Sequence, residues 1–219
     1  MREWKKKFIE FSLHNKILTF GKFQLKSGRN SPYFFNSKYF YTGLNILKLG
    51  KFYAHAIVHS KINPDMLFGL AYKGIPIVVA TAIALKIYYN INLPYCFNRK
   101  EFKNYGDQGI IIGPNINHNN IIIIDDVLTS GITIQKYINT KPNNSIYSIF
   151  VAFNRQEYGI SNVYSATEEI KNNHPYCKIF SIINIFDLIK YLIKYNKYPK
   201  KLKKIITYQN IYGCKKYII

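Results

Sequence analysis

The most constraining feature of the sequence is a run of four isoleucines, residues 121–124, that leads directly into Asp125 and Asp126. Four apolar residues in a row show no alternation, so a strand made of them has neither face in water. Such strands are typical of parallel sheets that helices cover on both faces. The run therefore predicts an α/β fold with a mainly parallel, twisted sheet flanked by helices.

Further apolar segments alternate between strand-like and helix-like patterns along the chain. Glycine and proline residues mark their boundaries, and Gly74 and Pro76 open the clearest helix, because proline is tolerated in a first helical turn. The predicted strands are residues 65–70, 93–98, 120–126, 145–154 and 176–185, and the predicted helices are residues 1–17, 45–59, 73–89 and 186–197.

Residues 18–40 differ from this alternating pattern. Their apolar residues alternate with polar ones around glycines and a proline, which predicts two short strands around a turn. With the amphipathic helix before them, residues 1–40 would form a small N-terminal hood over a site. Residues 1–219 show no repeat and no linker composition, so they are predicted to form a single domain.

Cysteine usage and apolar segment length exclude several classes of protein. Cys96, Cys177 and Cys214 are odd in number and far apart, which argues against a disulfide framework or a zinc site. The first 16 residues lack the order of a signal peptide. The longest apolar stretch, residues 75–85, is shorter than the ~20 residues of a membrane helix. A cytoplasmic protein with no membrane partner is expected.

The formal net charge of +20 would ordinarily indicate a nucleic-acid partner. The lysines, however, are scattered, and Lys, Asn, Ile, Tyr and Phe are abundant throughout, as in genomes that drift toward AT-rich codons. The densest basic run, residues 190–219, is interpreted as a solvated helix whose lysines extend along the surface. No nucleic-acid partner is expected.

The loop after the isoleucine run combines acids with small residues. In open parallel sheets, ligands bind beyond the carboxyl ends of the strands. Residues 129–133 would turn from strand into helix with outward backbone N–H groups, which suit a monophosphate. Asp125 and Asp126 lie about the length of a ribose away and can accept hydrogen bonds from two sugar hydroxyls. The predicted ligand is a ribose 5-phosphate.

The segment IIIIDDVLTSG resembles the phosphoribosyl-pyrophosphate signature of the type I phosphoribosyltransferases. The ordered motifs FIEF, LKSGRNSPYFFN, FGLAYKGIP, LPYCFNRKE and NRQE are similar to those of the orotate-specific members and extend over most of the chain. The resemblance implies the type I phosphoribosyltransferase fold. It also implies a glycosyltransferase of pyrimidine (UMP) biosynthesis, which converts orotate and 5-phosphoribosyl 1-pyrophosphate (PRPP) into orotidine 5'-monophosphate and pyrophosphate.

The resemblance further implies Mg²⁺, bound mainly through the substrate pyrophosphate. It implies a homodimer with shared active sites, in which a long loop of one subunit, residues 98–109, closes over the site of the other. This loop is expected to be mobile, and its closure would exclude water. The five histidines show no ligand spacing, so no metal site held by protein side chains is predicted.

The residues that match the family's functional positions fall into three groups. The catalytic group is Lys103, Arg99, Lys100, Asp125 and Asp126. The PRPP-binding group is Lys26, Tyr72, Lys73, Arg99, Lys100, Lys103, Tyr105, Asp125, Asp126, Val127, Leu128, Thr129, Ser130, Gly131, Ile132 and Thr133. The orotate-binding group is Phe34, Phe35, Thr129 and Arg155. The cations of these groups would stabilise the negative charge that gathers on the leaving pyrophosphate.

Five positions depart from the family pattern, and of these Leu70, Asn154 and Gln108 matter less than Tyr105 and Ile132. Tyr105 stands where a histidine is usual, and a phenol with a pKa near ~10 carries no positive charge at neutral pH. Ile132 replaces a threonine of the phosphate loop.

Two alternative functions are weighed against the enzyme. A non-catalytic PRPP-binding regulator that binds nucleic acid would have little use for Arg99, Lys100 and Lys103 on a closing loop. A purine phosphoribosyltransferase is less favoured, because the hood and Arg155 suit an acidic pyrimidine.

Overall fold

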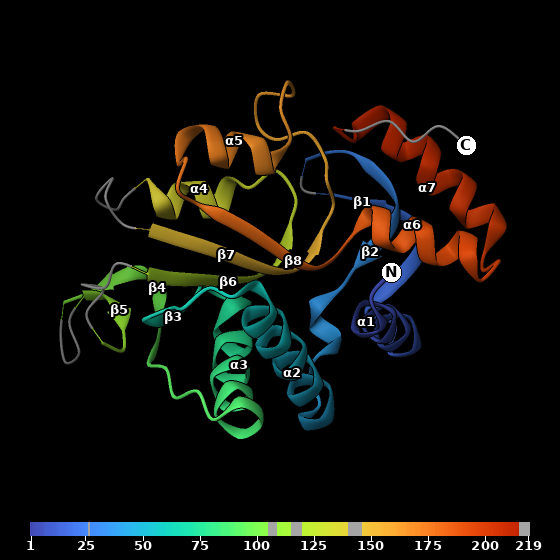
Figure 1. The fold of residues 1–219 in the computed structure, drawn as a ribbon. Helices are drawn as coiled ribbons and strands as arrows, with labels where there is room; N and C mark the ends of the chain where they lie inside the picture. The colour runs from blue at the N-terminus through green and yellow to red at the C-terminus, as the bar shows by residue number, and fades with distance from the viewer. Residues whose placement is uncertain (26, 105–108, 115–119, 140–145, 215–219) are drawn as a thin grey trace.

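The computed structural model describes residues 1–25, 27–104, 109–114, 120–139 and 146–214. Its centre is one six-stranded sheet (Figure 1). The strands are β3 (Met66–Gly69), β4 (Tyr95–Lys103), β5 (Gly109–Ile112), β6 (Asn120–Leu128), β7 (Ile146–Asn154) and β8 (Lys178–Asn184). They lie in the order β5-β4-β3-β6-β7-β8, and every neighbouring pair is parallel except β4 and β5. The predicted mainly parallel sheet is confirmed.

Helices cover both faces of this sheet. The helices α2 (Gly43–Ser60) and α3 (Gly74–Tyr89) lie on one face, and α4 (Ile132–Ile138) and α5 (Ala166–Asn173) lie on the other (Figure 1). Each face has its own apolar cluster, since side chains of a strand alternate between faces. Strand β6 contributes Ile122 and Ile124 to the α2–α3 side and Ile121 and Ile123 to the α4–α5 side. The isoleucine run is apolar throughout because both of its faces are buried.

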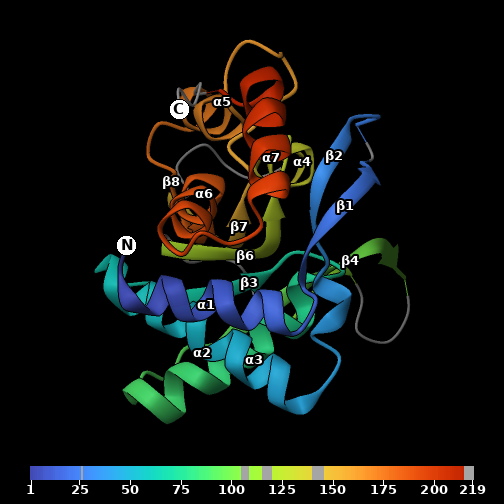
Figure 2. The same ribbon diagram turned by 90° about the vertical axis from the view of Figure 1, so that its right-hand side faces the viewer.

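A separate two-stranded antiparallel sheet forms the hood. It consists of β1 (Leu18–Gln24) and β2 (Asn30–Phe35), preceded by helix α1 (Glu3–His14) and followed by the short 3-10 helix η1 (Ser37–Tyr39). Helices α6 (Ile185–Lys194) and α7 (Pro199–Tyr212) end the described chain. Figure 2 shows β2 and α7 side by side, in agreement with their direct contacts. The C-terminal helix thus supports the N-terminal hood.

Three elements differ from the sequence-based expectations. Strand β4 continues to Lys103 and pairs with β5, so much of the expected loop 98–109 is a β-hairpin. Helix α5 was not predicted, although Ser165 and Glu168 form a capping box at its start. Helix α7 is not simply solvated, because Ile205 is fully buried and Tyr208 is 5% exposed against the hood. No helix in the described part of the chain has the length and apolar character needed to cross a membrane.

Candidate active site at the carboxyl end of the sheet

Two adjacent acids lie near the carboxyl end of strand β6. Asp126 is 5% exposed, and its Oδ2 accepts hydrogen bonds from Ser37 Oγ at 2.6 Å and Lys73 Nζ at 2.8 Å. Asp125 Oδ1 accepts one from the Asp126 backbone N–H at 2.9 Å. The Asp125 carbonyl accepts one from the Tyr53 hydroxyl at 2.6 Å. The hood, helix α2 and the turn after β3 therefore all hold the acid pair.

Burial of this pair changes its electrostatics. Burial raises the pKa of Asp125, and the negative charge of Asp126 raises it further, while the Asp126 backbone N–H and the Lys73 ammonium oppose this. Burial likewise raises the pKa of Tyr53 well above its ordinary value, with the two acids adding to the effect. Tyr53 therefore stays a neutral donor. The raised pKa favours a proton on Asp125 near neutral pH, so the pair offers both a donor and acceptors to the hydroxyl groups of a ligand.

The turn after β3 brings a second set of groups to the acids. A Cβ on Gly74 would lie 2.5 Å from the Ile124 carbonyl oxygen, so only glycine allows helix α3 to start this close to β6. The turn itself contains a cis peptide between Ala71 and Tyr72. The Tyr72 ring is 62% exposed and the Lys73 side chain 60% exposed. Tyr72 and Lys73 are thus accessible to a ligand beside the acid pair.

The loop between β6 and α4 has the geometry of a small-residue anion cradle. Gly131 has a φ of 76°, a left-handed conformation that favours glycine, and α4 begins at the next residue. Thr129 is exposed, whereas Leu128 is 1% exposed and packs in the core. Val127 and Leu128 lie within β6. Because the Leu128 side chain is buried, only the Leu128 backbone could make the predicted contact with PRPP. Ile132 and Thr133 are exposed in the first turn of α4.

Buried polar residues fix helix α4, which directly follows this loop. The Gln135 side chain of α4 donates to Glu169 Oε2 at 3.4 Å, and Glu169 accepts further hydrogen bonds from Ile160 and Ser161. Burial raises the pKa of Glu169, but these hydrogen bonds outweigh it and leave the pKa below its ordinary value. Glu169 is therefore a charged anchor that joins α5 to α4 and to residues 160–161.

The three predicted cations between residues 99 and 103 lie on strand β4 and not in a loop. Arg99 Nη1 donates to the Gly109 carbonyl at 2.9 Å across the hairpin. Lys100 Nζ lies 4.5 Å from the centre of the Tyr72 ring, which brings β4 next to the turn after β3. The Asn98 side chain accepts from the Ala71 N–H at 2.8 Å and fixes these two segments together. Lys26 and Tyr105 lie outside the described residues.

The two adjacent phenylalanines of the hood face opposite ways. Phe35 is 3% exposed and stacks on Phe153 with 5.5 Å between ring centres and an interplanar angle of 4°. Phe34 is half-buried and stacks on Phe23 across the hairpin at 5.4 Å. Phe35 can therefore offer a base only its backbone, because its ring belongs to the core. The predicted aromatic contact with a base is left to Phe34.

Arg155, the predicted partner of the orotate carboxylate, lies in a buried polar cluster. It is 1% exposed, its Nε donates to Glu157 Oε1 at 2.7 Å, and its Nη2 donates to Ser31 Oγ at 2.9 Å. Its guanidinium carbon lies 4.2 Å from the centre of the Tyr33 ring. A ligand carboxylate would therefore have to use Nη1, and orotate binding by Arg155 stays a prediction.

Comparison with known proteins agrees with this arrangement. A phosphoribosyl transferase domain matches residues 37–157, from η1 through the acid pair to the Arg155 cluster. An orotate phosphoribosyltransferase of Buchnera aphidicola subsp. Acyrthosiphon pisum (strain Tuc7) is 51% identical over 96% of this chain and 99% of its own length. The chain belongs to the orotate phosphoribosyltransferase family.

Other members of the orotate phosphoribosyltransferase family extend the comparison. One from Shigella sonnei (strain Ss046) is 42% identical over 97% of this chain and its full length. The crystal structure of one from Francisella tularensis matches with a TM-score of 0.81 and 36% identity, over 94% of this chain and 99% of that chain. The type I phosphoribosyltransferase fold implied by the sequence motifs is confirmed.

Two residues of this site were not among the predicted ones. Ser37 follows the hood motif SPYFFN directly, and a hydroxyl after a base-binding strand was the available signal. Tyr53 is one of many apolar and aromatic residues in α2, and nothing in its spacing separates it from core residues. Both depend on contacts that span 72 residues or more.

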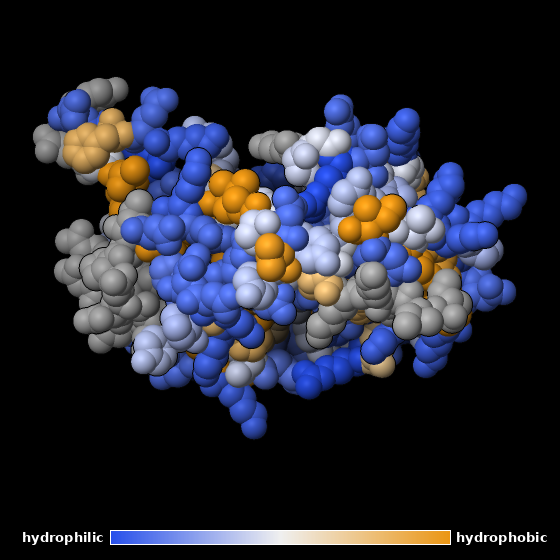
Figure 3. Space-filling model, turned by 90° about the horizontal axis from the view of Figure 1, so that it is seen from above, coloured by the Kyte–Doolittle hydropathy of each residue, from blue (hydrophilic) through white to orange (hydrophobic). Residues whose placement is uncertain are grey.

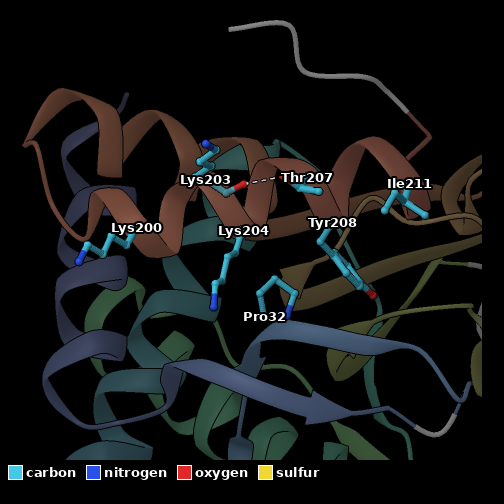
Figure 4. A pocket seen from close by; sticks show the side chains of 7 residues that line it. All are labelled: Pro32, Lys200, Lys203, Lys204, Thr207, Tyr208 and Ile211. Atoms are coloured by element: carbon cyan, nitrogen blue, oxygen red, sulfur yellow. Dashed lines mark hydrogen bonds between the residues drawn. The ribbon is translucent and has the colours of Figure 1, made fainter.

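The site is distinct from a groove between α7 and β2, shown in Figure 4. This groove has a volume of about 590 Å³ and is lined by Pro32, Lys200, Lys203, Lys204, Thr207, Tyr208 and Ile211. None of the predicted site residues lines it. Its connection to the site is Tyr208, whose hydroxyl lies 3.4 Å from Arg155 Nη2.

Proposed function

We propose that this chain transfers ribose 5-phosphate from PRPP to orotate, giving orotidine 5'-monophosphate and pyrophosphate in de novo pyrimidine biosynthesis. The observation that carries the proposal is the placement of Asp125 and Asp126 between the small-residue loop and Lys73. This order matches the order of groups in PRPP, with the phosphate at one end, the ribose hydroxyls between, and the pyrophosphate at the other end. Membership in the orotate phosphoribosyltransferase family supports the same substrates.

We infer a mechanism that relies on placed charges. As the bond between ribose C1 and pyrophosphate breaks, positive charge develops on the ring and negative charge on the leaving group. Backbone N–H groups of residues 129–131 would hold the 5'-phosphate, and Asp125 and Asp126 would accept hydrogen bonds from the ribose hydroxyls. Lys73 and Lys100 would stabilise the leaving pyrophosphate. A ring nitrogen of orotate would form the new bond to C1 and release its proton to the pyrophosphate or to water. Lys73 would leave Asp126 to reach the pyrophosphate.

We propose that Mg²⁺ binds through the pyrophosphate oxygens of the substrate and lowers the negative charge on the leaving group. Among the described residues, no three side chains of His, Cys, Asp or Glu gather as a metal site. The carboxylate oxygens of Asp125 and Asp126 are the hard donors that suit Mg²⁺ and lie nearest to the proposed substrate.

We propose that the chain acts as a homodimer with shared active sites. The α2–α3 face carries exposed apolar side chains, which are Leu44, Leu47, Ile83, Ile87 and Tyr88. The opposite face, viewed in Figure 3, is mostly hydrophilic with separated hydrophobic spots. Exposed apolar side chains on these two adjacent helices favour pairing through α2 and α3. The hairpin β4–β5 lies at the edge of the sheet and would reach the partner's site.

We further propose that residues 1–219 act as one domain, with residues 1–40 as the base-binding hood, in the reducing cytoplasm. The hood residues Phe8 and Phe35 share one apolar cluster with Ile122 of the central strand. Cys96, Cys177 and Cys214 form no disulfide within the described residues, as suits a reducing compartment.

Loss of orotate absorbance tests the proposed reaction. The purified chain with orotate, PRPP and Mg²⁺ is expected to consume orotate only when all components are present. Lys103→Ala is expected to lower the rate at least tenfold, because a cation near the leaving group is lost. Lys194→Ala on α6 is the matched control and should leave the rate unchanged.

Failure of orotate consumption while PRPP still binds would contradict the enzyme and favour the non-catalytic regulator. That regulator would also bind DNA or RNA at physiological salt. The enzyme is expected to show no such binding.

A further inference from the structure

Ser37 is a hood residue with a direct hydrogen bond to the acid pair. Its Oγ donates to Asp126 Oδ2 at 2.6 Å, across 89 residues of sequence. Ser37 is the first residue of η1 and lies two positions after Phe35, the last residue of β2. This contact joins the segment proposed to hold the base to the strand proposed to hold the ribose.

The backbone around Ser37 is fixed by neighbouring contacts. The Asn36 N–H donates to the Ile17 carbonyl at 2.6 Å, and the Asn36 side chain accepts from the Lys38 N–H at 3.3 Å. The ring of Phe35, which directly precedes Asn36, is anchored in the core by its stacking on Phe153. The Ser37 hydroxyl therefore has a defined position relative to the central sheet.

The two donors to Asp126 Oδ2 differ in freedom. Lys73 donates at 2.8 Å from a long side chain that is 60% exposed, whereas Ser37 donates from a short, half-buried side chain. A lysine ammonium on a flexible stem can move to another anion at little cost, and a serine on an anchored turn cannot. When Lys73 leaves, an Asp126 that is 5% exposed would lose a charge-assisted bond.

We propose that Ser37 is a positioning residue that keeps Asp126 Oδ2 bonded when Lys73 transfers to the pyrophosphate of PRPP. Asp126 Oδ1 then stays directed at a ribose hydroxyl. This inference rests on the proposed function, because it assumes that PRPP binds across Asp126 and Lys73. Ser37 touches no reacting atom and acts through Asp126, so its loss weakens PRPP binding more than it slows turnover.

Steady-state kinetics of three variants test the role of Ser37. Ser37→Ala is expected to raise the KM for PRPP about tenfold with kcat changed less than twofold, since one hydrogen bond to a charged group is lost. Ser37→Thr keeps the hydroxyl and should restore KM to within about threefold of the wild type. Ser60→Ala is the matched control, because among the described residues the Ser60 hydroxyl bonds only at its own helix end.

Direct PRPP binding by calorimetry tests the transfer of Lys73. Ser37→Ala is expected to raise the Kd about tenfold in the wild-type background but less than threefold in the Lys73→Ala background. In that background no ammonium leaves Asp126 on binding. Equal losses in both backgrounds would overturn the transfer. An unchanged KM in Ser37→Ala, or a fall in kcat and thermal stability without a change in KM, would overturn the positioning role.

The same measurements separate this inference from the proposed function. A wild type that binds PRPP but consumes no orotate, with weaker binding in Ser37→Ala, would contradict the function and keep the inference. If the wild type consumes orotate and Ser37→Ala has the same kinetics as the wild type, the result would support the function and contradict the inference. A wild type that does not bind PRPP would contradict both.

Discussion

Two charged clusters lie at the carboxyl ends of neighbouring strands, and they are built in opposite ways. Near the end of β6, Asp126 pairs with Lys73, whose side chain is 60% exposed, and Asp125 lies beside it without an ion pair among the described residues. Just after β7, the Arg155 guanidinium is paired at 2.7 Å with Glu157, which is 2% exposed and also bonded to Arg29. The acid pair thus has bonding capacity left for a ligand, whereas the Arg155 cluster is largely satisfied within the protein.

This difference suits the acid pair to ligand binding and the Arg155 cluster to structural support, although both lie at the same edge of the sheet. The Arg155 cluster connects β7 to hood residues Ser31 and Tyr33 and to Tyr208 of α7, three segments distant in sequence. Buried ion pairs of this kind become costly when one partner is removed, because the other charge stays buried. The acid pair, by contrast, has an exposed lysine as its partner, and the proposed ligand can displace that lysine.

The largest expected effect is on stability and comes from Arg155→Met. This change leaves Glu157 buried with only Arg29 as a charged partner, so the free energy of unfolding should fall by about 3 kcal/mol in urea denaturation. Arg155→Met combined with Glu157→Gln should regain part of that loss, because the unpaired charge is gone. A stable Arg155→Met variant that loses only orotate affinity would show that Arg155 is mainly a ligand residue.

The next effect is on activity and comes from Asp126→Asn. The amide keeps the shape of the side chain but loses the negative charge that strengthens its hydrogen bonds from the ribose hydroxyls. The value of kcat/KM should therefore fall about a hundredfold. The free energy of unfolding should change by less than about 1 kcal/mol, because Lys73 is exposed and can be solvated. A loss of stability as large as that of Arg155→Met would erase the contrast between the two clusters.

The smallest effect is a pH-dependent gain of stability in Asp125→Asn. Because the pKa of Asp125 is raised in the folded state, the folded protein retains a proton that the unfolded chain releases above about pH 4. Wild-type stability should therefore fall as the pH rises from 5 to 8. Asp125→Asn removes this group and should be about 1 kcal/mol more stable at pH 8, with reduced activity.

Urea denaturation at pH 5 and pH 8 measures this effect. Asp65→Asn is the control, because Asp65 is exposed at the opposite end of the sheet. It should leave the pH dependence unchanged. An Asp125→Asn variant whose stability still falls between pH 5 and 8 would show that another group is responsible.

Sequence patterns identified most residues of the candidate site because they are close together in the sequence. The isoleucine run, Asp125, Asp126 and the residues up to Gly131 are contiguous, and their order along one strand and turn already places acids beside an anion cradle. The parallel sheet followed from the same run, because only a strand buried on both faces is apolar at every position. Local hydrogen bonding and burial were enough for these features.

Tertiary structure decided what distant segments do to one another. It turned Phe35 into the core and left Phe34 outward, paired β4 with β5, and buried one face of α7 against the hood. It also brought Ser37 and Tyr53 to the acid pair and enclosed Arg155 with Ser31 and Tyr208. The Ser37 and Tyr53 contacts span 89 and 72 residues, and a hydroxyl has the same local sequence pattern whether or not its partner is present.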